Sequence, residues 1–233
     1  MNDDINILVV EDDSDINSLL CNILSKRGYM VRGAFSGSEA LMCLEQFQYD
    51  LLLLDLMLPG VDGESIIEQV RKDKVMPIIV ISAKTSQEDK INVLMSGADD
   101  FISKPFDINE VVARVEAQLR RYKKFSVSND IGETKLTYKD LVLDTESKQV
   151  YIKENEITLT AREFAILELL MSNPKKVFTR ANLFESVWEN EFLGDDNTVN
   201  VHVSNLRSKL SKVDKGTDYI KTVWGIGFKL NDV

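Results

Sequence analysis

Asp55 directly follows a run of four leucines, Leu51 to Leu54. A carboxylate at the end of a strand that is buried on both faces is costly unless the protein uses it. One use is to accept a phosphoryl group, which needs a divalent cation to offset the charge and donors to bind the phosphate oxygens. Three other apolar runs are followed by residues that could bind the cation or the phosphate: Glu11 and Asp12 after the first, Ser82 after the second and Lys104 after the third. These residue types predict that Asp55 is a phosphoryl acceptor.

The four runs would bring these residues together if they were parallel strands of one sheet. The carboxyl ends of the strands in an open parallel sheet share one edge, and ligands bind in the crevice outside that edge. Each residue alone also has an ordinary explanation, as a turn former, a helix cap or a solvated lysine. The coincidence of all four strand ends favours a functional site over these explanations.

The first half of the chain alternates apolar runs with helical patterns, which predicts a doubly wound α/β domain with a five-stranded parallel sheet. The first helix should begin at Ser14, which is placed to cap it, and end at Gly28. Strands are predicted near residues 7–10, 29–34, 51–54, 78–81 and 101–103, and further helices near 38–46, 64–72, 88–96 and 109–122.

Residues 123–134 are polar and lose this periodicity, so we place a linker there, between domains at 1–122 and 135–233. In the second domain, Thr160 and Glu163 form a capping-box pattern that begins a helix ending before Pro174. Short antiparallel strands are predicted at 136–138, 141–144, 149–152 and 157–158. Another helix should follow Thr179, a third should span 197–211, and two short strands should flank the turn at 224–227. This order predicts an α+β domain.

Composition narrows the class of protein. The 233 residues carry a net charge of −10, which argues against indiscriminate nucleic-acid binding. Of this charge, −9 lies in residues 1–122 and −1 in residues 123–233, so the second half is nearly neutral. No apolar run is long enough to span a membrane and the chain starts with acidic residues, which predicts a cytoplasmic protein with no membrane partner. Cys21 and Cys43 lack any metal-site spacing and are expected to be reduced, buried thiols.

Several motifs together resemble a known family. In the first half they are ILVVEDD, LLLLDLMLPGVDG, the pair Ser82–Ala83 and GADDFISKPF; in the second half they are LTAREFAILELL, NTVNVHVSNLRSKL and TVWGIGFKL. With these motifs the chain resembles the OmpR/PhoB-type two-component response regulators. The resemblance implies a flavodoxin-like receiver followed by a winged helix-turn-helix domain.

The resemblance also implies roles for individual residues of the receiver. Asp55 would be the phosphoacceptor, and Mg²⁺ would be bound by Glu11, Asp12, Asp55 and the main-chain carbonyl of Met57. Ser82 and Lys104 would contact the phosphoryl group, and Phe101 takes the place of an aromatic switch residue. Phosphorylated receivers would form a homodimer through charged residues that would otherwise pass for a solvated face: Lys90, Asp99, Asp100, Glu110 and Arg114.

The second half is expected to bind DNA through the helix at 197–211. Val199, Val203, Leu206 and Leu210 form its apolar stripe, which must face the domain core. Residues placed to read base edges are Asn197, Asn200, Val201, Ser204, Asn205 and Ser208, and phosphate contacts are expected from Arg207, Lys209 and Lys221. Trp224 lies in the wing, where family members often carry arginine. His202 is expected to be structural, and the resemblance implies that the acidic loop 189–196 contacts RNA polymerase.

The sequence therefore predicts a transcription regulator that is not an enzyme in the turnover sense. A cognate histidine kinase would phosphorylate Asp55, and the dimer would bind promoter DNA with tandem half-sites. Two alternatives remain open. One is a DNA-binding protein that works without phosphorylation and carries a relic receiver. The other is an aspartate-nucleophile phosphohydrolase, which usually has a second Asp two residues after the nucleophile, where this chain has Met57.

Overall fold

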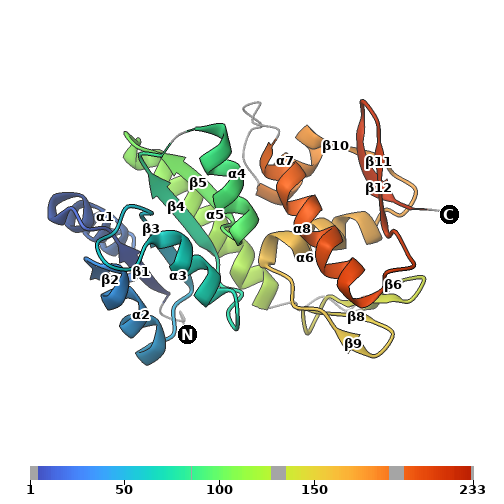
Figure 1. Cartoon of the computed structure of the whole chain (residues 1–233), viewed down its shortest axis with the longest axis horizontal. Coiled ribbons are helices and arrows are strands. Elements are labelled where there is room, and N and C mark those ends of the chain that lie inside the picture. Colours follow the sequence, from blue (N-terminus) through green and yellow to red (C-terminus); the bar gives the residue numbers. More distant parts are fainter. Residues whose placement is uncertain (1–4, 85, 127–134, 189–196, 232–233) are drawn as a thin grey trace. The chain divides into compact units, whose positions relative to one another are not determined.

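The computed structural model of the chain describes residues 5–84, 86–126, 135–188 and 197–231. The chain divides into two compact units, Met1–Tyr122 and Lys123–Val233, each with its own hydrophobic core (Figure 1). None of the helices within the described ranges combines the length and the hydrophobicity of a membrane-spanning segment.

The first unit is built on one five-stranded sheet. Its strands are β1 (Asn6–Val10), β2 (Met30–Ala34), β3 (Leu51–Leu54), β4 (Ile78–Ser82) and β5 (Asp100–Ser103), all parallel, in the order β2-β1-β3-β4-β5. The helices are α1 (Ser14–Lys26), α2 (Gly37–Gln46), α3 (Gly63–Val70), α4 (Gln87–Ser96) and α5 (Ile108–Ser126). This confirms the predicted doubly wound α/β fold.

Helices cover both faces of this sheet (Figure 1), which explains why every residue of β3 and β4 is buried and why both strands are apolar except for the final Ser82 of β4. Alternate strand residues such as Ile7, Leu51 and Ile79 pack against α1 and α5. The intervening residues, Leu52 and Val80 among them, are equally buried and face the opposite side. Because the apolar layers stop where the strands end, the polar residues that follow the strands lie together along one edge.

Several element ends differ from the prediction by a few residues, and two of these differences have a clear physical cause. The N-cap of α1 is Asp13 rather than Ser14, because the Asp13 carboxylate accepts hydrogen bonds from the amides of Asp15 (2.9 Å) and Ile16 (3.1 Å). Helix α5 continues to Ser126, four residues into the predicted linker, since no Gly or Pro ends it earlier. The rest of that linker, 127–134, lies outside the described residues.

The described residues of the second unit form two small antiparallel sheets and three helices in addition to the end of α5. One sheet has the order β6-β7-β8-β9, formed by Lys135–Tyr138, Leu141–Asp144, Gln149–Ile152 and Asn155–Glu156. The other has the order β10-β12-β11, formed by Phe178–Thr179, Gly227–Leu230 and Ile220–Val223. The last strand of the first sheet was predicted at 157–158 but lies two residues earlier, at Asn155–Glu156. Strand β10 was not predicted, because two residues are too few to show a pattern.

Helices α6 (Ala161–Met171), α7 (Arg180–Trp188) and α8 (Asn197–Val213) share one core with both sheets. The capping box of Thr160 and Glu163 forms as predicted at the start of α6. His202 is buried on α8 and its ring lies 5.3 Å from that of Trp188, as expected for a structural histidine. The core therefore fixes α8 against α6 and α7.

Candidate functional site

Three carboxylates come together at the carboxyl edge of the five-stranded sheet. Asp55 follows β3 and is 4% exposed; Glu11 follows β1 and is also buried, whereas Asp12 is exposed. Each offers one oxygen, and these oxygens all lie within 4.8 Å of one another. The strand order places β1 beside β3, so the sheet itself brings the three residues together.

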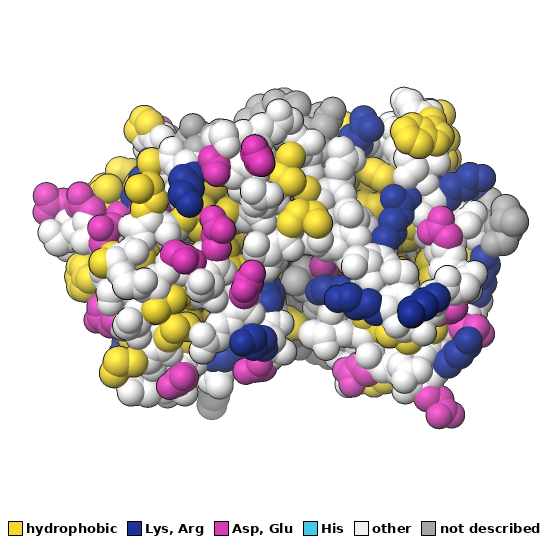
Figure 2. Space-filling model, viewed as in Figure 1, with side chains coloured by type: hydrophobic (Ala, Val, Ile, Leu, Met, Phe, Trp, Pro, Cys, Tyr) yellow, Lys and Arg dark blue, Asp and Glu magenta, His cyan; other side chains and the backbone are white. Residues whose placement is uncertain are grey.

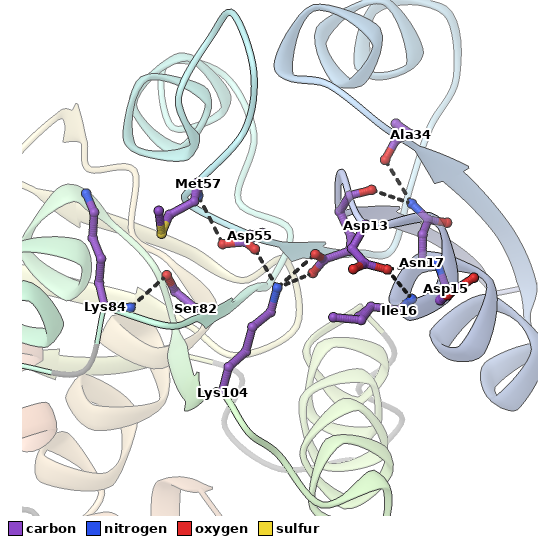
Figure 3. Close-up of polar contacts among 11 residues, drawn as sticks. Asp13, Asp15, Ile16, Asn17, Ala34, Asp55, Met57, Ser82, Lys84 and Lys104 are labelled. Atoms are coloured by element: carbon purple, nitrogen blue, oxygen red, sulfur yellow. Dashed lines mark hydrogen bonds and ion pairs between the residues drawn. The ribbon is translucent and has the colours of Figure 1, made fainter.

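Lys104 joins two of these carboxylates (Figure 3). Its Nζ donates to Asp55 Oδ2 at 2.6 Å and to the two Glu11 carboxylate oxygens at 2.8 and 2.7 Å. Lys104 follows β5, and its amide donates to the Ser82 carbonyl at 2.9 Å, which anchors it to the end of β4. Lys104, at the end of β5, thus bonds to carboxylates at the ends of β1 and β3.

The electrostatics of the cluster follow from this burial. Burial raises the pKa of Glu11, and the nearby Asp55 charge raises it further against the opposing effect of Lys104. Burial lowers the pKa of Lys104, but its hydrogen bonds to Asp55 and Glu11 raise it by more, so its pKa lies above the usual value. A buried carboxylate with a raised pKa is one whose negative charge is not fully compensated.

The charge balance suits a divalent cation. When ionised, the three carboxylates carry three negative charges, and Lys104 offsets one of them. The remaining two match an ion such as Mg²⁺, which prefers carboxylate oxygens. The donor chemistry and the spacing of the described residues therefore fit a magnesium site.

The other residues predicted for this site lie around the cluster. Ser82 is the buried last residue of β4, and its Oγ accepts from the Lys84 amide at 3.3 Å (Figure 3). The amide of Met57 donates to Asp55 Oδ1 at 3.0 Å, and its side chain is exposed. Phe101 is half-buried in β5, with the Lys90 ammonium 5.6 Å from its ring centroid.

Sequence reasoning missed Asn17. This buried residue of α1 donates to the Glu11 carbonyl at 3.0 Å and so contacts the backbone that carries the acidic pair. A signal was present, because Asn17 falls on the same helix face as Leu20 and Leu24, where a polar residue needs a reason.

The second unit presents α8 and the β11–β12 hairpin at its surface. Ser204 and Ser208 are exposed on α8, and Lys221 is exposed on β11. Trp224, at the tip of the hairpin, is 91% exposed. Figure 2 shows hydrophobic side chains gathered at this tip, with Lys and Arg side chains along the same face of the unit.

Two family models match the chain: the response regulator receiver domain at residues 7–116 and the C-terminal domain of transcriptional regulatory proteins at residues 154–230. The regulatory protein VanR of Enterococcus faecium is 39% identical over 225 residues, which cover 96% of this chain and 97% of VanR. The chain belongs to the OmpR/PhoB family of response regulators.

Further relatives agree with this assignment. The alkaline phosphatase synthesis transcriptional regulatory protein PhoP of Bacillus subtilis is 40% identical over 231 residues, covering 97% of this chain and 96% of PhoP. A RitR mutant structure has a TM-score of 0.77 at 33% identity, covering 97% of this chain and 99% of that one. DrrB of Thermotoga maritima, described as an OmpR/PhoB homologue, has a TM-score of 0.52 at 26% identity and covers 98% of this chain and all of its own.

This response regulator therefore combines a receiver with a DNA-binding transcriptional regulatory domain. Its relatives are transcription regulators, which is consistent with a protein that is not an enzyme.

The structure corrects one residue predicted for the receiver's dimer surface. Asp99 is fully buried, and its Oδ2 accepts from Arg71 Nη2 at 2.6 Å and from the Ile78 amide at 2.9 Å. A side chain held in this way cannot pair with a second copy. Asp100 and Glu110 both receive hydrogen bonds from Arg114 within the chain, at 2.9 to 3.0 Å.

Three residues predicted for DNA contact are buried or have partners within the second unit. Val201 is buried rather than presented to the groove. Arg207 Nη2 donates to the Ile220 carbonyl at 2.7 Å and to Thr222 Oγ1 at 2.8 Å, so its guanidinium ties α8 to β11. Lys209 Nζ lies 2.6 Å from the buried Glu163 carboxylate, which attaches α8 to the capping box of α6. These two cations have structural partners.

Three asparagines predicted for DNA contact are half-buried, and one of them bonds to a neighbouring helix. Asn197 and Asn205 are half-buried on α8. Asn200 Oδ1 accepts from Arg180 Nε at 3.2 Å, which links α8 to α7. The acidic loop 189–196, predicted to contact RNA polymerase, lies outside the described residues.

Proposed function

We propose that a histidine kinase phosphorylates Asp55 and that this modification controls binding of the protein to promoter DNA. The observation that carries the proposal is the position of Lys104 Nζ, 2.6 Å from Asp55 and within 2.8 Å of Glu11, at the meeting point of three strand ends. A buried carboxylate beside one ammonium and two further carboxylates has the groups that phosphoryl transfer to an aspartate needs.

Mg²⁺ would be held by Glu11, Asp12 and Asp55, with the main-chain carbonyl of Met57 as a further ligand. When bound, the ion offsets the negative charge shared by the carboxylates and the incoming phosphoryl group. The protein's own contribution is to hold the carboxylates at the sheet edge. Glu11 and Asp55 are both buried at that edge, and Lys104 bonds to both carboxylates.

In the transfer itself, an oxygen of Asp55 would form a bond to phosphorus while the bond from phosphorus to the kinase histidine nitrogen breaks. The electron pair of the broken bond stays on the nitrogen. Lys104 is already within hydrogen-bond reach of Asp55 and would bind an oxygen of the new acyl phosphate. Ser82, at the end of the neighbouring strand, is the proposed donor to another oxygen.

Activated receivers would pair through the surface formed by α4, β5 and α5. Lys90 of α4 lies over Phe101 of β5, and Arg114 of α5 joins Asp100 of β5 and Glu110 of α5, so charged residues of all three elements take part in contacts among them. An arrangement in which Arg114 exchanges intrachain for intermolecular carboxylates would hold a symmetric dimer. Phe101 would transmit the state of Asp55 to this face through its contact with Lys90.

The dimer would bind tandem half-sites, and the acidic loop 189–196 would contact RNA polymerase. Ser204 and Ser208 would read base edges in the major groove, while Lys221 and Trp224 would contact the backbone and the neighbouring groove. Because the proposed target is promoter DNA, the protein would act in the cytoplasm. Pairing two such modules makes the second contact effectively intramolecular, so dimerisation would supply most of the useful affinity.

The proposal is tested by the response of DNA binding to phosphorylation. DNA fragments selected from a random pool by the phosphorylated protein supply the probe, and fluorescence anisotropy measures affinity with and without acetyl phosphate and Mg²⁺. We expect phosphorylation to tighten binding to two tandem half-sites by about tenfold or more and to change binding to one half-site little. Equal affinity in both states would favour the relic-receiver alternative.

The different surroundings of Lys221 and Lys209 give a second prediction. Lys221→Ala should weaken binding to all DNA sequences alike and reduce the salt slope by about 1, because an exposed lysine contacts phosphate. Lys209→Ala should leave the salt slope unchanged and instead lower the unfolding free energy of the second unit by about 1–3 kcal/mol, because it removes a charged hydrogen bond from buried Glu163. Salt-dependent anisotropy and urea unfolding separate the two effects. A smaller salt slope for Lys209→Ala would contradict its structural role.

A further inference from the structure

Asn17 is a polar side chain on the buried face of α1. It is 2% exposed, and it shares this face with Leu20 and Leu24. A buried amide is costly unless its donors and its acceptor are satisfied, so its partners indicate its role. The partners of its amino group are main-chain carbonyls at the edge of the sheet where Glu11, Asp12 and Asp55 lie.

The amide group of Asn17 joins two strand ends (Figure 3). Its Nδ2 donates to the Glu11 carbonyl at 3.0 Å and to the Ala34 carbonyl at 2.9 Å. Since both partners are carbonyl oxygens, only the amino group can face them, and this fixes the orientation of the amide. The Oδ1 atom in turn accepts from Cys21 Sγ at 3.4 Å. Asn17 is therefore fully bonded between the end of β1 and the end of β2.

These bonds act on the loop that carries the acidic pair. The Glu11 amide already donates to the Ala34 carbonyl at 3.1 Å, and Asn17 adds a second connection across the same gap. On the other side of Asp12, the Asp13 carboxylate caps α1. Asp12 has an exposed side chain, yet it lies between two residues whose positions are fixed to the same helix. The loop is thus held at both ends.

Gly33 makes room for this arrangement. A Cβ atom built at Gly33 would overlap Asn17 Oδ1, whereas its next neighbours, Asn17 Cγ and Cys21 Sγ, would lie at 3.3 and 3.4 Å. The backbone of Gly33 is not in the left-handed region, so alanine fits the strand itself. The glycine is needed because the Asn17 amide approaches closely.

We propose that Asn17 is a positioning residue for the divalent-cation site and that Gly33 is its structural complement. Asn17 touches neither the ion nor the phosphoryl group; it holds the main chain of Glu11, and through it Asp12, in the arrangement that binds the ion. This inference rests on the proposed function, because it presumes that Glu11, Asp12 and Asp55 bind the cation. Residues that orient metal ligands in this way typically contribute 10- to 100-fold to metal affinity.

The test is titration calorimetry of the full chain with Mg²⁺. We expect Asn17→Ala to bind Mg²⁺ at least about tenfold more weakly than the wild type. Gln118→Ala is the matched control, since Gln118 is a buried amide of the same unit, lies on α5 and is not part of the acidic cluster. It should bind Mg²⁺ as the wild type does. Phosphorylation of Asn17→Ala by acetyl phosphate should need more Mg²⁺ for half-maximal rate yet reach a near-normal rate at saturation.

A double-mutant cycle with Gly33→Ala tests the contact itself. In the wild-type background, Gly33→Ala should weaken Mg²⁺ binding because the new methyl group displaces the Asn17 amide. In the Asn17→Ala background the methyl group has space, so the same substitution should have little further effect. If Asn17→Ala does not fold, the Gly33→Ala variant alone decides the outcome.

The possible results separate the two levels of inference. If the wild type binds no Mg²⁺, or binds it equally well after Asp55→Asn, the proposed function fails. If the wild type binds but Asn17→Ala and Gly33→Ala bind equally well, or if Gln118→Ala loses as much affinity, the role of Asn17 is refuted and the proposed function stands. Strictly additive effects of the two substitutions would also refute the pairing of Asn17 with Gly33.

Discussion

Asp55→Asn is expected to abolish phosphorylation of the protein while leaving its fold intact. The amide has nearly the same shape as the carboxylate, and an oxygen at the Oδ1 position can still accept from the Met57 amide. An amide is not a nucleophile toward phosphorus, and it supplies one fewer negative charge to the cation. Intact-mass spectrometry after incubation with acetyl phosphate and Mg²⁺ measures the result, with one phosphoryl group expected on the wild type and none on the variant.

Asp50→Asn is the matched control for this substitution. Asp50 and Asp55 flank the same strand, β3, at opposite ends, and the Asp50 carboxylate accepts from the Asn6 amide at 2.8 Å. It should be labelled as the wild type is, because it lies at the wrong edge of the sheet. Undiminished labelling of Asp55→Asn would move the acceptor to another residue, and continuous phosphate release by the wild type would instead favour the phosphohydrolase alternative.

The receiver fold could be predicted from sequence because its signals are local. Each strand is a short apolar run, and parallel strands place the residues that follow them at one edge. Asp55, Glu11 and Lys104 needed only this rule to be brought together. The C-terminal sheets were harder to predict, because strands of two residues such as β10 have no periodicity to detect.

The partners of charged side chains could not be predicted from spacing. Asp99 pairs with Arg71 across 28 residues and Lys209 with Glu163 across 46, and no pattern within one helix or strand contains that information. The helical spacing of apolar residues in α8 correctly predicted which residues face the core, but Val201, which was predicted to contact DNA, is buried as well. Sequence spacing therefore did not reveal that these charged residues have partners within the chain.

Arg71→Met is expected to destabilise the first unit strongly, because it removes the partner of buried Asp99. The Arg71–Asp99 ion pair is almost fully buried, with side-chain exposures of 11% and 1% at 2.6 Å. Arg71 also donates to the carbonyls of Gly97 (2.8 Å), Lys74 (3.2 Å) and Met76 (2.7 Å). Removing the arginine leaves Asp99 as an uncompensated buried charge, so the unfolding free energy should fall by about 3–5 kcal/mol.

Arg27→Met provides the comparison, because its ion pair with Glu116 has the same 2.6 Å length but exposures of 50% and 39%. An exposed ion pair of this kind contributes about 0–1 kcal/mol to stability. Arg27→Met should therefore lower the unfolding free energy far less than Arg71→Met, although the two ion pairs have the same length. Both tryptophans, Trp188 and Trp224, lie in the second unit, so tryptophan fluorescence does not report on the receiver. Urea unfolding followed by circular dichroism, with hydrogen exchange of receiver peptides, measures the difference.

Adding Asp99→Asn to Arg71→Met identifies the cause of the loss. Asparagine keeps an oxygen for the Ile78 amide but removes the buried charge. If the uncompensated carboxylate is what destabilises the single variant, the double variant should regain a large part of the lost stability, because removing both charges costs less than removing one. If stability is not regained, the loss comes instead from the three backbone carbonyls that Arg71 no longer satisfies, and Arg71 then acts mainly by tying the end of α3 to the loops before β4 and β5.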